Sequence, residues 1–129
     1  MNKYQAQHNY WSGFGIPAYN ELTVPENIPD GKGGMVPLEP PYLTYQAVEG
    51  SLDGPVTASA ALYYRSTSWS AITNKVTEMA PQINKQIKID GGYLKIRKPA
   101  ANFAQQASDP DPAIRRINLM VEVEFLTRI

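Results

Sequence analysis

Few residues of this chain have the side-chain types and the spacing that catalysis or metal binding requires. His8 is the only histidine and there is no cysteine, so a two-histidine metal site, a thiolate nucleophile and a Ser–His or Cys–His relay all lack their usual parts. Tyr4, His8 and Trp11 are spaced i, i+4 and i+7, the spacing of one helix face. We therefore interpret His8 as a side chain on a short helix and not as a catalytic group.

The chain contains two pairs of carboxylates, each with its members two residues apart. Asp109 and Asp111 alternate with prolines and offer oxygen atoms to a hard cation, but the calcium-loop spacing with its terminal glutamate is missing, which favours a polar turn. Glu122 and Glu124 are two residues apart on a predicted strand and project from one face, toward solvent, a lumen or a neighbouring chain. We expect no catalytic residue, no metal and no cofactor.

One glycine-rich segment and one basic cluster are of the kinds that can bind ligands. The segment Gly31–Gly34 lacks the glycine spacing, the Lys-Ser/Thr pair and the preceding strand of a phosphate loop. A basic cluster surrounds Tyr93, a stacking group, and consists of Lys85, Lys88, Lys95, Arg97 and Lys98. A solvated sheet edge is the favoured interpretation, because edge lysines discourage strand pairing. Contact with DNA that passes through a ring is the alternative.

The composition is that of one globular domain. The 129 residues are 43% hydrophobic and 19% charged, which suits a single core over residues 1–129. Twelve basic residues balance twelve acidic ones, so no dedicated binder of nucleic acid or acidic membranes is indicated. Residues 1–11 lack the apolar region of a signal peptide, and no segment reaches the ~20 apolar residues of a membrane span. We expect no membrane association.

The first half of the chain should contain a helix, an arm and two strands. The helix spans 3–12, within an N-terminal segment of residues 1–15. Residues 16–41 are rich in proline and glycine, which predicts an extended arm without regular structure. Residues 42–48 and 56–65 predict two antiparallel strands, joined by a turn at Asp53-Gly54-Pro55.

The second half should contain one main helix and three more strands. Ser68 is the expected N-cap of an amphipathic helix that either ends near Met79 or kinks at Pro81. Its apolar stripe is Trp69, Ile72, Val76, Met79 and Ile83. Asp90-Gly91-Gly92 predicts a tight hairpin between strands 87–89 and 93–97. A loop over 98–113 and an alternating strand over 117–125 follow.

These elements predict an α+β fold in which a mostly antiparallel sheet of about five strands is packed by one main amphipathic helix. A short N-terminal helix and the arm precede this sheet-and-helix core, which covers residues 42–129. We expect a single domain.

Seven segments, taken in their order along the chain, resemble a family of viral proteins. They are residues 10–19 (YWSGFGIPAY), 42–45 (YLTY), 63–69 (YYRSTSW), 89–94 (IDGGYL), 102–105 (NFAQ), 114–117 (IRRI) and 124–127 (EFLT). Together they resemble the small tail-terminator and tail-completion, or head–tail joining, proteins of long-tailed bacteriophages and prophages. The length and proline density of residues 20–41 depart from the usual outline of that family.

The resemblance implies a non-enzymatic structural subunit with a small α+β fold. Such subunits close into a hexameric ring that caps the tail tube, stops its polymerisation and presents a surface to the head. The implied partners are copies of the chain, the tail-tube protein, the head-connector protein and, transiently, DNA in the ring. The implied location is the head-proximal end of the virion tail, and the host cytoplasm during assembly.

Interface roles are assigned by residue type and loop position. Aromatic side chains are enriched at interfaces, and the aromatic candidates are Tyr42, Tyr45, Tyr63, Tyr64 and Trp69, of which two or three must be core. The loops 31–41 and 102–112, which include Phe103, Asp109 and Asp111, are candidates for contact with the tube or the connector. Candidates for the lumen or DNA are Lys88, Lys95, Arg97, Glu122 and Glu124.

Three other functions remain open. The chain could be another head–tail connector or a minor tail protein, since one fold serves several positions in an assembly. It could be a small ligand- or nucleic-acid-binding module that uses Tyr63, Tyr93 and nearby basic side chains on a sheet face. An enzyme ranks third, because it would have to work through carboxylates alone.

Overall fold

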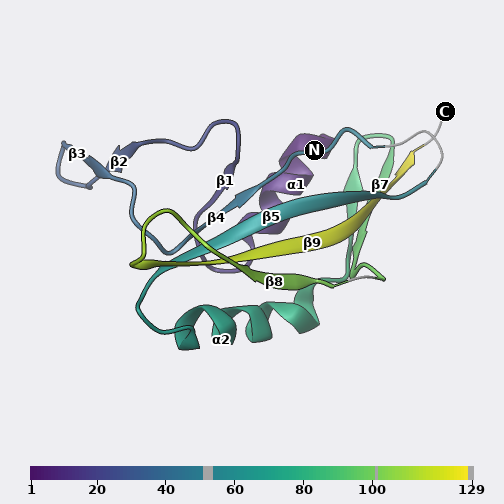
Figure 1. Cartoon of the computed structure of the whole chain (residues 1–129). Coiled ribbons are helices and arrows are strands. Elements are labelled where there is room, and N and C mark those ends of the chain that lie inside the picture. Colours follow the sequence, from purple (N-terminus) through teal and green to yellow (C-terminus); the bar gives the residue numbers. More distant parts are fainter. Residues whose placement is uncertain (51–53, 101, 128–129) are drawn as a thin grey trace.

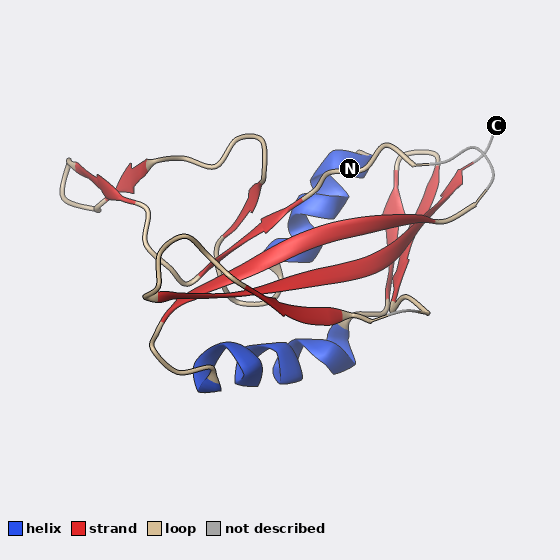
Figure 2. Cartoon of the chain, viewed as in Figure 1, coloured by secondary structure: helices blue, strands red, loops and turns tan. Residues whose placement is uncertain are grey.

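The computed structural model describes residues 1–50, 54–100 and 102–127. This part of the chain folds into two α-helices, a curled sheet of seven strands and a separate two-stranded sheet (Figures 1 and 2). The predicted α+β class is confirmed. The sheet is larger than the five strands expected, because two short strands add to those that the sequence pattern predicted.

The main sheet is mostly antiparallel, as predicted. Its strand order is β1-β4-β5-β9-β7-β6, with β8 beside β9, and only the β1–β4 pair is parallel. The strands are β1 (Ala18–Asn20), β4 (Tyr42–Tyr45), β5 (Val56–Arg65), β6 (Lys85–Ile89), β7 (Gly92–Arg97), β8 (Ala104–Ala107) and β9 (Ile114–Thr127). The strands missed by the sequence analysis are β1, inside the expected arm, and β8, inside the expected loop 98–113.

Strands β5 and β9 form the centre of the sheet. Their alternating apolar residues face the helices, and the register sets Ala58 opposite Val121 and Ala60 opposite Leu119. All four side chains are buried. Small side chains on β5 therefore lie beside larger ones on β9, which fills the core evenly.

Helix α2 (Ser70–Met79) packs on β5 and β9 and is followed by a 3₁₀ turn, Ala80–Gln82 (Figure 1). The predicted stripe is confirmed at Ile72, Met79 and Ile83, which are fully buried, and the helix ends at Met79 as expected. The predicted N-cap is wrong. Trp69 occupies that position without a side-chain hydrogen bond, and the Ser68 hydroxyl accepts from the backbone N–H of Ser70 at 3.1 Å.

Helix α1 (Lys3–Ser12) lies where it was predicted but buries a different face. Tyr10 and Trp11 are buried with Ala6, whereas Tyr4 is 46% exposed and His8 is exposed. The helix contacts both β1 and β6, the two ends of the strand order, so it closes the opening of the curled sheet. The hydroxyl of Tyr10 donates to the carbonyl of Ile83 at 2.8 Å, and burial raises the pKa of Tyr10.

A buried glutamine joins α1 to the chain after β4. The side chain of Gln7 is 2% exposed; its amide donates to the carbonyl of Val48 at 2.9 Å, and its oxygen accepts from the Val48 N–H at 2.8 Å. We expect Gln7→Ala to lower the free energy of unfolding by about 1–3 kcal/mol, because both backbone groups lose their partner. Urea denaturation measures the change. Asn9→Ala, at an exposed position of the same helix, is the control for helix composition, and an equal effect of both variants would contradict this role of Gln7.

Residues 16–41 do not form the uninterrupted arm that composition predicted. Strand β1 joins the main sheet, where the carbonyl of Pro17 accepts from the N–H of Leu43 at 2.8 Å. Strands β2 (Asn27–Pro29) and β3 (Met35–Pro37) pair with each other, and this β2–β3 hairpin projects away from the main sheet (Figure 1). The strand expected over 42–48 is also shorter, since β4 ends at Tyr45.

Candidate functional site

The main sheet has an outer face, on the side opposite the helices. Because residues paired across strands share a face, the register sets Tyr42, Tyr63 and Arg116 side by side there, on β4, β5 and β9. The same alternation places Lys95 and Glu124 on this face of β7 and β9. Tyr42 and Tyr63, two of the predicted interface residues, thus share one face of the sheet with the candidates Lys95 and Glu124, which lie at its other end.

An aromatic ladder crosses the outer face. The rings of Tyr19 and Tyr42 meet edge to face at 6.2 Å between centroids, and those of Tyr42 and Tyr63 stack at 5.0 Å. The guanidinium of Arg116 lies 5.5 Å from the centroid of Tyr63, within cation–π range, and its Nε donates to Oδ1 of Asn118 at 2.9 Å. Partial burial raises the pKa of the Tyr42 hydroxyl, and the neighbouring Tyr63 raises it further. The ladder therefore holds its side chains in fixed places.

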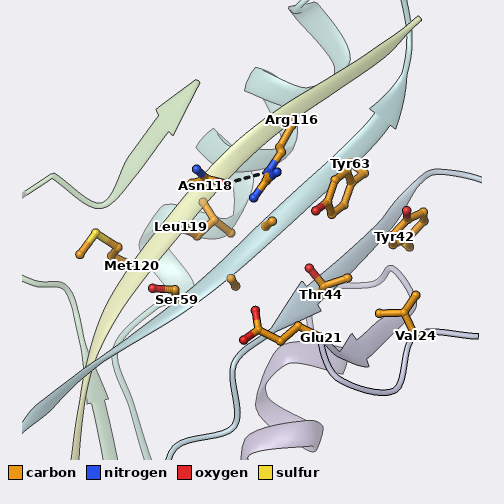
Figure 3. Close-up of a pocket in the computed structure, with 12 residues that line it drawn as sticks. Glu21, Val24, Tyr42, Thr44, Ser59, Tyr63, Arg116, Asn118, Leu119 and Met120 are labelled. Carbon is orange, nitrogen blue, oxygen red and sulfur yellow. Dashed lines mark hydrogen bonds between the residues drawn. The ribbon is translucent and has the colours of Figure 1, made fainter. Parts of the chain in front are cut away.

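A groove of about 470 Å³ runs beside this ladder (Figure 3). Its floor carries the small side chains Ser59 and Ala61 of β5, and Met120 of β9 adds an apolar group that is 38% exposed. Glu21 and Val24, which follow β1, line the opposite side from Arg116. We call this feature the sheet groove. It offers aromatic, apolar and charged groups in one concave site.

The sequence analysis missed most of the groove. The alternation predicted over 117–125 puts Asn118 and Met120 on the same strand face as Glu122 and Glu124. The neighbours of Arg116 could not be found in this way, since they depend on the register between β5 and β9. Glu21 lay within the expected arm, where nothing indicated a place beside the sheet.

The candidates for a lumen or DNA surface occupy the other end of the outer face. Arg97 forms ion pairs with Glu122 at 3.0 Å and with Glu124 at 3.7 Å, and Lys95 lies opposite Glu124 in the strand register. Lys88 is exposed on β6. Acidic side chains thus balance the basic ones, and this end of the sheet is a mixed-charge surface and not a basic strip.

Four interface candidates support the fold instead of lining the outer face. Tyr45 is buried, and its hydroxyl lies 3.0 Å from Nδ1 of His8. Tyr64, Trp69 and Phe103 are half-buried and pack against the core. These four side chains therefore make most of their contacts within the subunit.

Asp109 and Asp111 form the polar turn that was favoured over a cation site. Asp109 accepts from the N–H of Asp111 at 3.0 Å, and Asp111 accepts from the N–H of Ala113 at 2.9 Å. Arg65 forms ion pairs with Asp111 at 3.4 Å and with Glu39 at 3.0 Å. It therefore connects the two loops that were predicted to contact partners. Within the described ranges, no group of three His, Asp or Glu side chains is placed to hold a metal ion.

The β2–β3 hairpin exposes apolar side chains at one end of the molecule. Met35 is 62% exposed and Val36 is 39% exposed, and Leu22, before the hairpin, is 85% exposed. The two strands pack mainly against each other. Its tip is ordered by Asp30, whose carboxylate accepts from the N–H groups of Lys32 at 2.7 Å and Gly34 at 3.1 Å.

The tip should lose order only in acid. The hydrogen bonds from Lys32 and Gly34 lower the pKa of Asp30 below its ordinary 3.8. Because the folded pKa is depressed, the stabilisation is complete above the ordinary pKa and is lost as the pH falls through the lowered one. We expect the amide shifts of Lys32 and Gly34 to stay constant from pH 8 to about pH 5 and to move below about pH 4. Asp30→Asn is the control that cannot titrate, and movement of the wild-type shifts near neutral pH would contradict the assignment.

Comparison with known proteins found no relative of this chain: no family model, no curated protein and no solved structure matches it. No helix in the described residues is long and apolar enough to cross a membrane. The function is therefore inferred from the residues and geometry of the chain itself.

Proposed function

We propose that this chain is a non-enzymatic structural subunit of a phage tail. Its copies assemble into a hexameric ring that caps the tail tube, ends tube polymerisation and presents a surface for attachment of the head. The observation that carries the proposal is the β2–β3 hairpin, which projects from the main sheet and exposes Met35 and Val36 (Figure 1).

A projecting hairpin of this kind needs a partner surface. Each of its strands has three residues, and an isolated two-stranded hairpin is marginally stable in water. Its exposed apolar side chains contribute little to the subunit's own core. Burial of such side chains against another chain stabilises both the hairpin and the contact, at roughly 25 cal/mol for each Å² of apolar surface removed from water.

The outer face supports the same function. It carries tyrosine, arginine and methionine side chains, which are the types enriched at protein interfaces. Ring closure requires complementary surfaces on one subunit and no bond-making step. The proposed partners are the tail-tube protein and the head-connector protein, with transient contact to DNA that passes through the ring.

Tube capping tests the proposal directly. The tail-tube protein encoded in the same genome is polymerised with and without this chain, and tube lengths and ends are measured by electron microscopy. We expect shorter tubes with a ring at one end. Tubes of unchanged length and bare ends would overturn the proposal, whereas binding to the connector alone would favour another head–tail connector.

The ladder of Tyr42, Tyr63 and Arg116 favours one second candidate, a single-stranded nucleic-acid-binding module. Fluorescence anisotropy with a labelled oligothymidine, over a range of salt concentrations, separates the two functions. Tight and salt-dependent binding by a monomer would favour the module. The stacking of Tyr42 on Tyr63 leaves no gap between these rings for a base, which favours the structural subunit.

A further inference from the structure

We infer that the β2–β3 hairpin of one copy binds in the sheet groove of the next copy. This inference rests on the proposed function, because it names the contact that would build the ring. It joins two features of the described surface: a hairpin with exposed apolar side chains, and a groove of about 470 Å³.

The hairpin of the same chain does not occupy the groove. Glu21 and Val24 line the groove a few residues before β2 begins, and from there the chain leads away from the sheet to the projecting hairpin (Figures 1 and 3). A second copy can present the hairpin without any rearrangement of the first. The occupant is therefore assigned to another copy.

The charges of the two features are complementary. The groove contains one acidic and one basic side chain, Glu21 and Arg116, and the hairpin tip contains one of each, Asp30 and Lys32. None of the four forms an ion pair with another described residue. Lys32 can therefore meet Glu21 while Asp30 meets Arg116, and this pairing would fix the orientation of the hairpin.

The apolar groups also match. Met35 and Val36 of the hairpin are exposed, and the groove offers the rings of Tyr42 and Tyr63 and the exposed thioether of Met120. Methionine adapts its shape to irregular gaps and packs well on aromatic rings. The contact would thus combine the two charged pairs at the hairpin tip with apolar packing beside them, on β3.

The symmetry of such a contact leads to a ring. The hairpin and the groove are different surfaces of one subunit, so the contact is heterologous: each copy gives its hairpin to one neighbour and accepts one from the other. Repetition of a heterologous contact closes a ring if the rotation permits. A self-complementary two-fold contact would stop at a dimer.

The test uses two variants, each with one half of the contact removed. Met35→Asp combined with Val36→Asp replaces the exposed apolar side chains of the hairpin with charged ones and leaves the groove intact. Ser59→Trp fills the groove from an exposed position on β5 and leaves the hairpin intact. Native mass spectrometry measures each variant alone, both in an equal mixture, and the wild-type chain, with folding checked by circular dichroism.

We expect wild-type rings, loss of all rings in each variant alone, and dimers that grow no further in the mixture, because a single intact hairpin–groove pair remains. Thr57→Trp is the matched control, since it adds the same side chain two residues away on the same face but outside the groove, and it should form rings. A mixture that stays monomeric, rings from either variant alone, or a wild-type chain that is monomeric at millimolar concentration would overturn the contact.

Failure of this contact can be told apart from failure of the proposed function. Wild-type rings that persist in both variants would remove the hairpin–groove contact and leave the ring intact. A wild-type chain that neither forms rings nor caps tubes would remove both.

Discussion

Replacing Trp11 with alanine is expected to lower the free energy of unfolding by about 3–5 kcal/mol. Trp11 is 2% exposed, lies 4.9 Å from Tyr10 and 6.2 Å from Phe14 between ring centroids, and stacks on Tyr45 at 6.5 Å. Its ring packs α1 onto Tyr45 of β4. Its removal leaves a cavity where α1 meets β4, and chemical denaturation followed by far-ultraviolet circular dichroism measures the loss.

The control for Trp11 lies on the same helix. Tyr4 is 46% exposed, so Tyr4→Ala removes an aromatic ring from α1 without opening the core. We expect Tyr4→Ala to change the free energy of unfolding by less than about 1 kcal/mol. Equal losses for the two variants would show that α1 does not bury the face seen in the structure.

Gly50→Ala is expected to destabilise the protein by about 2–6 kcal/mol. Gly50 has φ +102°, which strains any residue with a side chain, and a Cβ atom there would lie 2.8 Å from Cε2 of Phe125. Backbone strain and overpacking each contribute about 1–3 kcal/mol. The aromatic ring of Phe125 packs against the core, so it cannot move aside freely. Thermal unfolding of the variant measures the loss.

Gly91→Ala separates the two causes. Gly91 has φ +83° in the β6–β7 turn, and a Cβ atom there would meet no described atom within 4 Å. It therefore reports backbone strain without the collision, and we expect a loss of about 1–3 kcal/mol. A loss at Gly50 no larger than that at Gly91 would contradict the contact with Phe125.

Elements with strong local patterns could be predicted from the sequence. The 3–4 spacing of Ile72, Met79 and their neighbours gave α2, and strict alternation gave most of β9. Asp90 and the two glycines after it gave the β6–β7 hairpin, whose strands pair as expected. In each case the pattern can be recognised within a single segment, because it does not depend on which other segments pack against it.

Elements that depend on distant partners could not be predicted. Strand β8, with the sequence Ala-Gln-Gln-Ala, has neither alternation nor good strand formers, and it exists because β9 offers it an edge. Strand β1 pairs in the same way with β4. Helix α1 was placed correctly, but its buried face was missed because Gln7 is polar and is buried for its bonds to Val48.

The residues of the candidate site were also predictable only in part. Tyr42 and Tyr63 were chosen by residue type, and both lie in the aromatic ladder. Tyr45 was chosen on the same ground but is buried, because neighbouring residues on a strand point to opposite faces. Glu21, Ser59 and Arg116 carried no signal of their own. The register between β5 and β9 brings Ser59 and Arg116 to one groove, and the chain that follows β1 adds Glu21.

Self-assembly of the chain into a ring can be read from its mass in solution. Multi-angle light scattering is measured over a concentration series from micromolar to millimolar, starting from a subunit of 14.3 kDa. We expect the average mass to rise with concentration and to level off at about six subunits, because a closed ring adds no further copies. A mass that stays at one subunit over the whole series, or that rises without limit, would contradict this expectation.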